Sequence, residues 1–175
     1  MSENAASPVE GPTAEQRRMG ELFWKQGFHC CEILIFLGLE AQGKTDPDLI
    51  RAAGQLSGGI GFSGKTCGAL MGGALLLGLY AGRGSVEEEE HPRLRVMTNE
   101  FIEWFAERQE KEYGGITCSD ITDDEACHVL ARCPKVLADV VKEVKSILRE
   151  HGFEWNQGRQ QTDATKTVCS SRAAP

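Results

Sequence analysis

Apolar residues recur at helical intervals along most of this chain, and no alternating pattern typical of β-strands appears. The segment TAEQ at 13–16 has the form of a capping box, which predicts a helix from there to about Lys25. A second helix is predicted from about 29 to 39. It is apolar nearly all round, so it should be central. Asp46 as N-cap and Pro47 at the first helical position predict a third helix, to about Gln55.

Glycine dominates the next thirty residues. Positions 54–84 hold 11 of the 20 glycines, and the segment GQLSGGIGFSGKT is too rich in glycine for a helix. We expect an ordered loop whose backbone approaches another part of the molecule closely. Thr66 is then the predicted cap of an apolar helix from Cys67 to about Tyr80. On this helix Gly68, Gly72 and Gly73 leave one face nearly bare, so another helix can come close.

The second half of the chain is also helical in pattern. Pro92 can open a long helix to about Tyr113, and TDDE at 122–125 is a second capping-box candidate, for a short helix to about Arg132. The dipeptide Cys133-Pro134 predicts the start of the last helix. The fold class is therefore all-α: a single compact bundle of about six helices, with a Gly-rich loop before the central helix.

The length of 175 residues suits one domain with a real core. We expect a disordered N-terminal arm at residues 1–12, a helical domain at 13–155 and a polar, disordered tail at 156–175 that contains Cys169.

Charge and hydropathy narrow the classes of function. The net charge is −7, from 19 basic and 26 acidic residues, which argues against a nucleic-acid partner. The longest uncharged apolar run, 67–82, falls short of the roughly 20 residues of a membrane helix, so we expect no membrane insertion. The first twenty residues lack the apolar core of a secretory signal. We therefore expect a cytoplasmic protein whose seven cysteines are reduced rather than paired in disulfides.

Four of the cysteines fall at predicted helix starts or loops, where a charged sulfur is tolerable. Cys67 opens the central helix and Cys133 precedes Pro134, so free N–H groups and the helix dipole should favour the thiolate of each. Cys118 lies in a turn, and Cys30 lies near the start of the second helix. Packing in the core is the alternative for each of them. Three others are given no chemical role: Cys31 and Cys127, which resemble packing residues, and Cys169.

Several motifs are absent or lack their context. Without CxxCH or CxxC we expect neither attached c-type haem nor a paired thioredoxin-like or zinc motif. GIGFSGKT at 59–66 fits the phosphate-loop pattern GxxxxGK[ST], but the segment before it looks helical rather than strand-like, so no nucleotide is expected. His29 and His128 each adjoin a cysteine. Either could bind or tune a metal, although a histidine satisfied by ordinary contacts is the alternative.

Taken together, four segments resemble the C-GCAxxG-C-C family, described as redox-active and named for four spaced cysteines. They are GFHCCEIL with Cys30, GGIGFSGKTCGALMGGALLLGLYAG with Cys67, YGGITCSDIT with Cys118, and RCPKVLADVVKEV with Cys133. The resemblance spans about residues 16–150, and the Gly-loop segment is its specific part. The additional Cys31, Cys127 and Cys169 depart from the pattern. A related domain occurs in split-Soret cytochromes c.

The resemblance implies an all-α fold and an iron–sulfur site with four cysteine ligands, Cys30, Cys67, Cys118 and Cys133. We expect a [2Fe–2S] or similar cluster, no haem, and transfer of electrons to a redox protein not identified by the sequence. Backbone N–H groups of the loop, at Gly59, Gly61 and Gly64, would approach the cluster sulfides.

Three alternatives remain open at the level of sequence. The first is a metal-free thiol–disulfide oxidoreductase in which Cys67 is the reactive thiol, so whether the protein is an enzyme stays open. The second is a structural or partner-binding module, since the bare face at Gly68 and Gly72 could pack a second subunit. A homodimer is expected in either case. The third is a zinc site of four thiolates.

Overall fold

The computed structural model describes residues 12–158, and over these residues the protein forms seven helices and no β-strand. The helices are α1 (Ala14–Trp24), α2 (Cys30–Ala41), α3 (Pro47–Gly54), α4 (Gly68–Ala81), α5 (Leu94–Tyr113), α6 (Cys118–Thr122) and α7 (Ala126–Glu150). The predicted all-α bundle is confirmed. The predicted arm at 1–12 and tail at 156–175, with Cys169, lie almost wholly outside the described residues.

Several helix starts follow from local capping, as predicted. At α1 the Thr13 side chain accepts from the Gln16 N–H, and the Gln16 side chain accepts in return from the Thr13 N–H. At α3 the carboxylate of Asp46 accepts from the Leu49 N–H at 3.0 Å, with a proline at the first helical position. Helix α5 starts at Leu94, two residues after the proline that was expected to open it.

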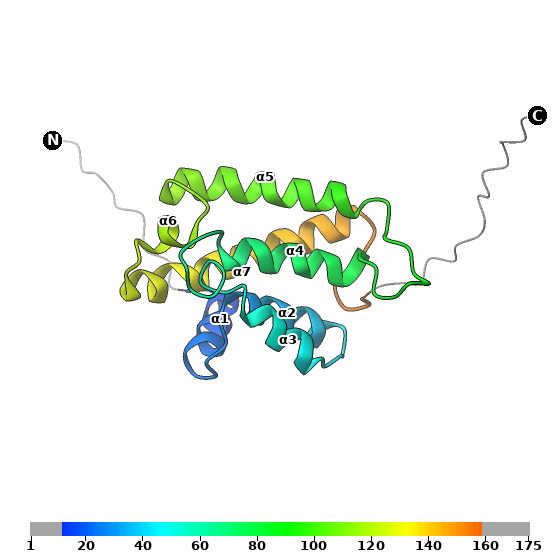
Figure 1. Cartoon of the computed structure of the whole chain (residues 1–175), viewed down its shortest axis with the longest axis horizontal. Coiled ribbons are helices and arrows are strands. Elements are labelled where there is room, and N and C mark those ends of the chain that lie inside the picture. The colour runs from blue at the N-terminus through cyan, green and yellow to red at the C-terminus, as the bar shows by residue number, and fades with distance from the viewer. Residues whose placement is uncertain (1–11, 159–175) are drawn as a thin grey trace, which may run out of the picture.

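The helices are arranged around α4. Figure 1 shows α5 along one side of α4, α1 to α3 along the other, and α7 crossing behind it. Helix α6 and the Gly-rich loop lie together at one end of the molecule, next to the N-terminal part of α7. None of the helices over residues 12–158 has the length and apolar character needed to cross a bilayer.

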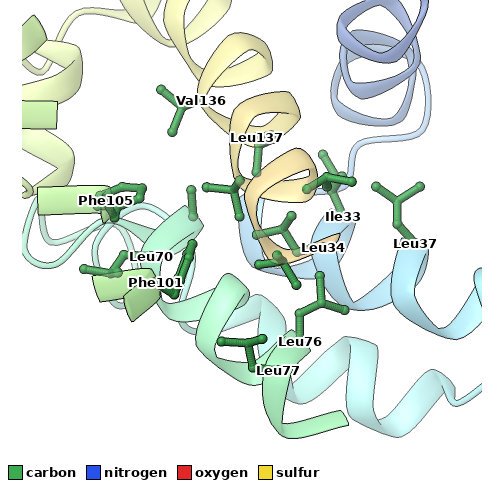
Figure 2. Close-up of a cluster of buried hydrophobic side chains, with 14 of the residues drawn as sticks. Ile33, Leu34, Leu37, Leu70, Leu76, Leu77, Phe101, Phe105, Val136 and Leu137 are labelled. Atoms are coloured by element: carbon green, nitrogen blue, oxygen red, sulfur yellow. The ribbon is translucent and has the colours of Figure 1, made fainter. Parts of the chain in front are cut away.

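The core is formed where α2, α4, α5 and α7 meet (Figure 2). Its labelled side chains are Ile33, Leu34 and Leu37 from α2, Leu70, Leu76 and Leu77 from α4, Phe101 and Phe105 from α5, and Val136 and Leu137 from α7. Most of them are essentially inaccessible to solvent. Burial of this apolar surface is the main favourable contribution to folding.

The bare glycine face of α4 allows the close helix packing that its sequence predicts. A Cβ at Gly72 would lie 2.7 Å from Cδ1 of Leu34 in α2, and one at Gly73 would collide with the ring of Phe101 in α5. Both glycines are buried inside this chain. The face proposed for a second subunit is therefore covered by the chain's own helices, and the homodimer itself stays a prediction.

Two predictions for the region after α5 are wrong. Residues 118–122 form α6, although a turn was predicted at Cys118, because Thr117 and Asp120 make a reciprocal capping box. The two helices predicted for 122–132 and from 133 onward are one, α7, which continues through Pro134. Thr122 is the last residue of α6 and caps nothing, and Glu125 is the N-cap of α7.

Candidate functional site

A cavity of about 560 Å³ lies at the end of the bundle where the Gly-rich loop, α6 and the starts of α2 and α4 meet α7. Its wall contains four cysteines: Cys30 at the start of α2, Cys67 at the start of α4, Cys118 in α6 and Cys133 in α7. The floor is buried and formed by Cys67, Ile121, Val136 and Leu137, whereas the mouth is exposed. The structure thus brings together all four cysteines that the sequence singled out.

Cys67 and Cys118 are placed side by side by two short antiparallel segments. Thr66 and Thr117 form an isolated β-bridge, and the Cys67 N–H donates to the Ile116 carbonyl at 3.1 Å. In the same ladder the Cys118 N–H donates to the Lys65 carbonyl at 2.6 Å. These bonds join residues some fifty positions apart, so local pattern alone cannot predict them. They fix the backbone of both cysteines on one wall.

Cys30 is the first residue of α2, as predicted, and His29 is its N-cap. The His29 N–H donates to the Glu32 side chain at 2.8 Å, which holds the start of the helix. The thiol of Cys30 packs against Gly68 at the start of α4, where a Cβ would collide with it. The glycine is therefore required for α4 to approach this thiol.

Cys133 and Cys67 differ from their predicted positions. Cys133 lies inside α7 rather than at a helix start, so it has no free N–H groups of a first turn beside it. Cys67 is the N-cap of α4, one position before the helix that it was expected to open. Cys118, expected in a turn, is the first residue of α6.

Cys67, Cys118 and Cys133 are hard to ionise in this environment, because the pKa of each thiol is raised. Burial, with smaller contributions from Cys30 and Cys118, raises the pKa of Cys133 from its ordinary value of 9.0 to about 12. Burial also raises the pKa of Cys67, followed by the effect of Cys30, and the Ala69 amide offsets only part of this. The pKa of Cys118 is raised by burial and then by Cys30. The expectation that a helix start favours the Cys67 thiolate is wrong, because desolvation outweighs the dipole.

The cysteines outside the cavity wall have other environments. Cys31 is fully buried, its N–H donates to the Ser57 hydroxyl at 3.2 Å, and its thiol donates to the Gly68 carbonyl at 3.2 Å. The predicted packing role of Cys31 is confirmed. Cys127 is exposed near the start of α7, so the prediction that it packs in the core is wrong. All six cysteines in the described residues are free thiols.

The Gly-rich loop follows α3, so a helix and not a strand precedes the GKT sequence, as expected. Among the three glycines predicted to bind a cofactor, Gly64 lines the cavity, whereas Gly59 and Gly61 are not part of its wall. The Gly61 N–H donates to the Gln55 carbonyl at 2.8 Å and the Gly64 N–H to the Gly58 carbonyl at 3.0 Å. These two N–H groups are thus used within the loop.

The two histidines beside cysteines have different positions. His29 lines the cavity and its Nδ1 lies 3.1 Å from Glu32 Oε2. His128 lies outside the cavity wall, with its Nδ1 3.0 Å from Asp123 Oδ2. The sequence reasoning did not identify the residues of the mouth, which are Phe23, Phe62, Asp124 and Glu125. No motif in the sequence marks these positions, because they come from separate segments that only the folded chain brings to one cavity.

The arrangement of donors bears on what the cavity can hold. Over the described residues, no three His, Cys, Asp or Glu side chains lie close enough together to hold a single metal ion. The four thiols instead surround a cavity, with ligand types suited to soft metals. A cluster of several metal atoms reaches its ligands across its own width, so this donor set fits such a group better than one ion such as zinc.

Comparison with known protein families identifies a match over most of the chain. A family model described as "Putative redox-active protein (C_GCAxxG_C_C)" matches residues 28–147. The matched range contains Cys30, Cys67, Cys118 and Cys133 and therefore the complete cysteine wall of the cavity. No curated protein and no solved structure matches the chain.

Proposed function

Because the chain belongs to the C_GCAxxG_C_C family of redox-active proteins, we propose that it transfers electrons through an iron–sulfur cluster held by Cys30, Cys67, Cys118 and Cys133. The observation that carries this proposal is the meeting of these four thiols, from four separate segments, around one cavity. Four cysteine thiolates are the usual ligand set of [2Fe–2S] and [4Fe–4S] clusters. A [2Fe–2S] cluster remains our expectation.

The raised pKa values support a metal-bound state of the thiols. A buried thiol with other thiols nearby does not ionise without a compensating positive charge, as the pKa of about 12 at Cys133 indicates. Metal ions supply that charge, and a coordinating thiol loses its proton. Because burial raises the pKa of Cys67, Cys118 and Cys133, this wall is suited to a cationic group, and these three thiols are poor free nucleophiles.

The surrounding residues would protect a bound cluster. Ile121, Val136 and Leu137 form an apolar floor that limits the access of water, which influences the reduction potential. When bound, the cluster would accept and release single electrons. Cys67, at the bottom of the cavity, and Cys118 would be held in register by the Thr66–Thr117 bridge.

A metal-free thiol–disulfide oxidoreductase is the second candidate, since the four thiols share one cavity. The raised pKa of Cys67 argues against it, because the thiolate is the attacking species and burial suppresses it. A disulfide between any two of these cysteines also requires their Cα atoms to lie within about 7 Å.

Anaerobic purification followed by iron and acid-labile sulfide analysis tests the proposal. We expect bound iron and sulfide with visible absorption, and a marked loss of both in each of Cys30→Ser, Cys67→Ser, Cys118→Ser and Cys133→Ser. Cys127→Ser is the matched control, because this cysteine is exposed and lies outside the cavity wall. A colourless protein that binds no iron after reconstitution with iron and sulfide would contradict the proposal.

A further inference from the structure

The mouth of the cysteine cavity carries a group of aromatic rings on one side. Phe62 from the Gly-rich loop contacts His29 edge-to-face, with ring centroids 4.9 Å apart. His29 in turn lies 6.2 Å from Phe23, which packs on Trp24 at 4.5 Å. The Phe62 side chain is 65% exposed, so most of its ring is available to a molecule that enters the mouth.

The backbone that presents Phe62 adopts an unfavourable conformation. Gly58, Gly59, Ile60, Gly61 and Phe62 all have positive φ, at 62°, 76°, 66°, 58° and 61°. Glycine adopts this left-handed region freely, but a β-branched or bulky residue does so at a cost. Ile60 is also half exposed, so its burial does not compensate. Such strain, held by hydrogen bonds like Phe62 N–H to the Ser57 carbonyl, is typical of ligand-contacting segments.

The mouth also carries two acidic residues. Asp124 and Glu125, in the link between α6 and α7, are both exposed and both line the cavity. The hydroxyl of Ser119 donates to Asp124 at 2.8 Å, which fixes that carboxylate. Among the described residues that line the cavity, none is a lysine or an arginine. The local field therefore favours uncharged or cationic molecules and disfavours phosphates and other anions.

We propose that this mouth is a binding site for a planar aromatic molecule, uncharged or cationic, that packs against Phe62 and His29 and faces Asp124 and Glu125. The whole cavity measures about 560 Å³, which includes the space beside the cysteines, so the ligand would occupy its outer part, between the rings and the solvent. The ligand would lie above the cysteines on the path to solvent. Its use as an electron carrier rests on the proposed function, whereas its binding does not.

The test uses two probes with the same ring system and opposite charge: 9-aminoacridine, a cation at neutral pH, and acridine-9-carboxylate, an anion. Binding to the anaerobically purified full chain is measured by calorimetry and by acridine fluorescence. We expect 9-aminoacridine to bind and acridine-9-carboxylate to bind at least tenfold more weakly, because of the two carboxylates at the mouth. Cyclohexylamine, a cation without a planar ring, should not bind measurably.

Variants of the chain separate the contribution of the Phe62 ring to binding from that of the two carboxylates. Phe62→Leu should weaken 9-aminoacridine binding about fivefold or more, while Phe62→Tyr, which keeps a ring, should retain it. The double variant Asp124→Asn and Glu125→Gln should weaken the binding of 9-aminoacridine and reduce its advantage in affinity over acridine-9-carboxylate. Phe153→Leu is the matched control, because Phe153 makes a similar edge contact with His91, at 5.0 Å, outside the cavity wall. It should leave binding unchanged.

The proposal would be overturned by equal affinity for both acridines, by unchanged binding in Phe62→Leu, or by no binding of 9-aminoacridine at concentrations up to about 1 mM. These results are independent of iron analysis. If the protein holds iron and sulfide but binds no acridine, only the proposed aromatic site is contradicted. If it binds acridine but holds no iron, only the proposed iron–sulfur cluster is contradicted.

Discussion

Gly68 determines how closely α4 approaches the thiol of Cys30. A methyl group at this position would collide with the Cys30 sulfur and would also lie 3.1 Å from the Cα of Ser57. One of its neighbours is the backbone of the Gly-rich loop, which cannot move away as easily as a flexible side chain. The absence of a side chain at Gly68 therefore shapes the cavity directly.

Gly68→Ala should lower the free energy of unfolding by about 1–3 kcal/mol, because an overpacked methyl group forces the neighbours apart. The matched control is Gly78→Ala in the same helix, where an added Cβ meets nothing within 4 Å. That variant should be more stable by about 0.5–1 kcal/mol, since alanine favours helices. Urea denaturation measures both. Equal effects of the two substitutions would contradict the steric explanation.

The reactivity of individual cysteines provides a second prediction at this scale. Burial raises the pKa of Cys67 and Cys133, so few of these thiols are ionised near neutral pH. With iodoacetamide at about pH 8, we expect exposed Cys127 to react first in the metal-free protein, and Cys67 and Cys133 to react only after unfolding. Mass spectrometry of peptides gives the order. Preferential labelling of Cys67 would favour the thiol–disulfide alternative.

At the scale of elements, α7 shows how packing overrides a local signal. Pro134 indicates a helix start in the sequence, yet it lies in the interior of a helix of 25 residues. The buried stripe that includes Val136, Val140 and Val144 packs continuously against the core, which keeps the helix in one piece. Pro134 has no N–H to donate, so the Leu130 carbonyl loses its partner in the helix.

Pro134→Ala should restore that hydrogen bond and raise the free energy of unfolding by about 1–3 kcal/mol. Thermal and urea denaturation followed by circular dichroism provide the measurement. A fall in stability would show that the proline ring packs better than we infer. Because Cys133 is the adjacent residue, iron content should be measured in the same variant.

Helices with strong local signals could be predicted from sequence, and those defined by tertiary contacts could not. The capping residues Thr13 and Asp46 locate α1 and α3 correctly, because each makes its bonds within one turn. Helix α6 escaped prediction because its five residues are too few to show a periodic pattern. The capping box that begins at Thr117 follows Gly114 and Gly115, and these glycines suggest an interruption between helices rather than the start of one.

At the scale of the whole molecule, the resemblance to a family implied that the four cysteines share one site, but the contacts that bring them together could not be predicted. The pairing of residues 64–67 with 116–119 joins two loops by hydrogen bonds that no spacing rule describes. The pKa of Cys67 also depends on tertiary contacts that the sequence does not reveal. Its position at a helix end suggests a thiolate, whereas the surrounding helices remove the water that a thiolate needs.

The stability of the metal-free protein should depend on pH through these thiols. Because the pKa of Cys133 is about 12 in the folded state and 9.0 ordinarily, the unfolded chain loses its protons first as the pH rises. The folded state binds more protons, so the free energy of unfolding should fall as the pH increases from 9 towards 12. Below pH 9 this contribution is fully present.

Thermal melting of chelator-treated protein over this pH range measures the effect. The double variant Cys67→Ser and Cys133→Ser should show a shallower decrease in melting temperature than the unmodified chain, because serine does not ionise in this range. A decrease of the same slope in both proteins would assign the effect to other groups, such as Tyr80, whose pKa burial also raises to about 12.

The wall of the cavity also has a consequence for the order of events during synthesis. Cys30 leaves the ribosome first, and Cys133 follows roughly a hundred residues later, which takes about 5–20 s at ordinary translation rates. Until α7 docks, the cavity lacks the side that Cys133 and Val136 supply. Three of the four cysteines are therefore synthesised well before the wall of the cavity can close. A group held by all four thiols becomes fully enclosed only when α7 docks, so its binding should be coupled to the docking of this last helix.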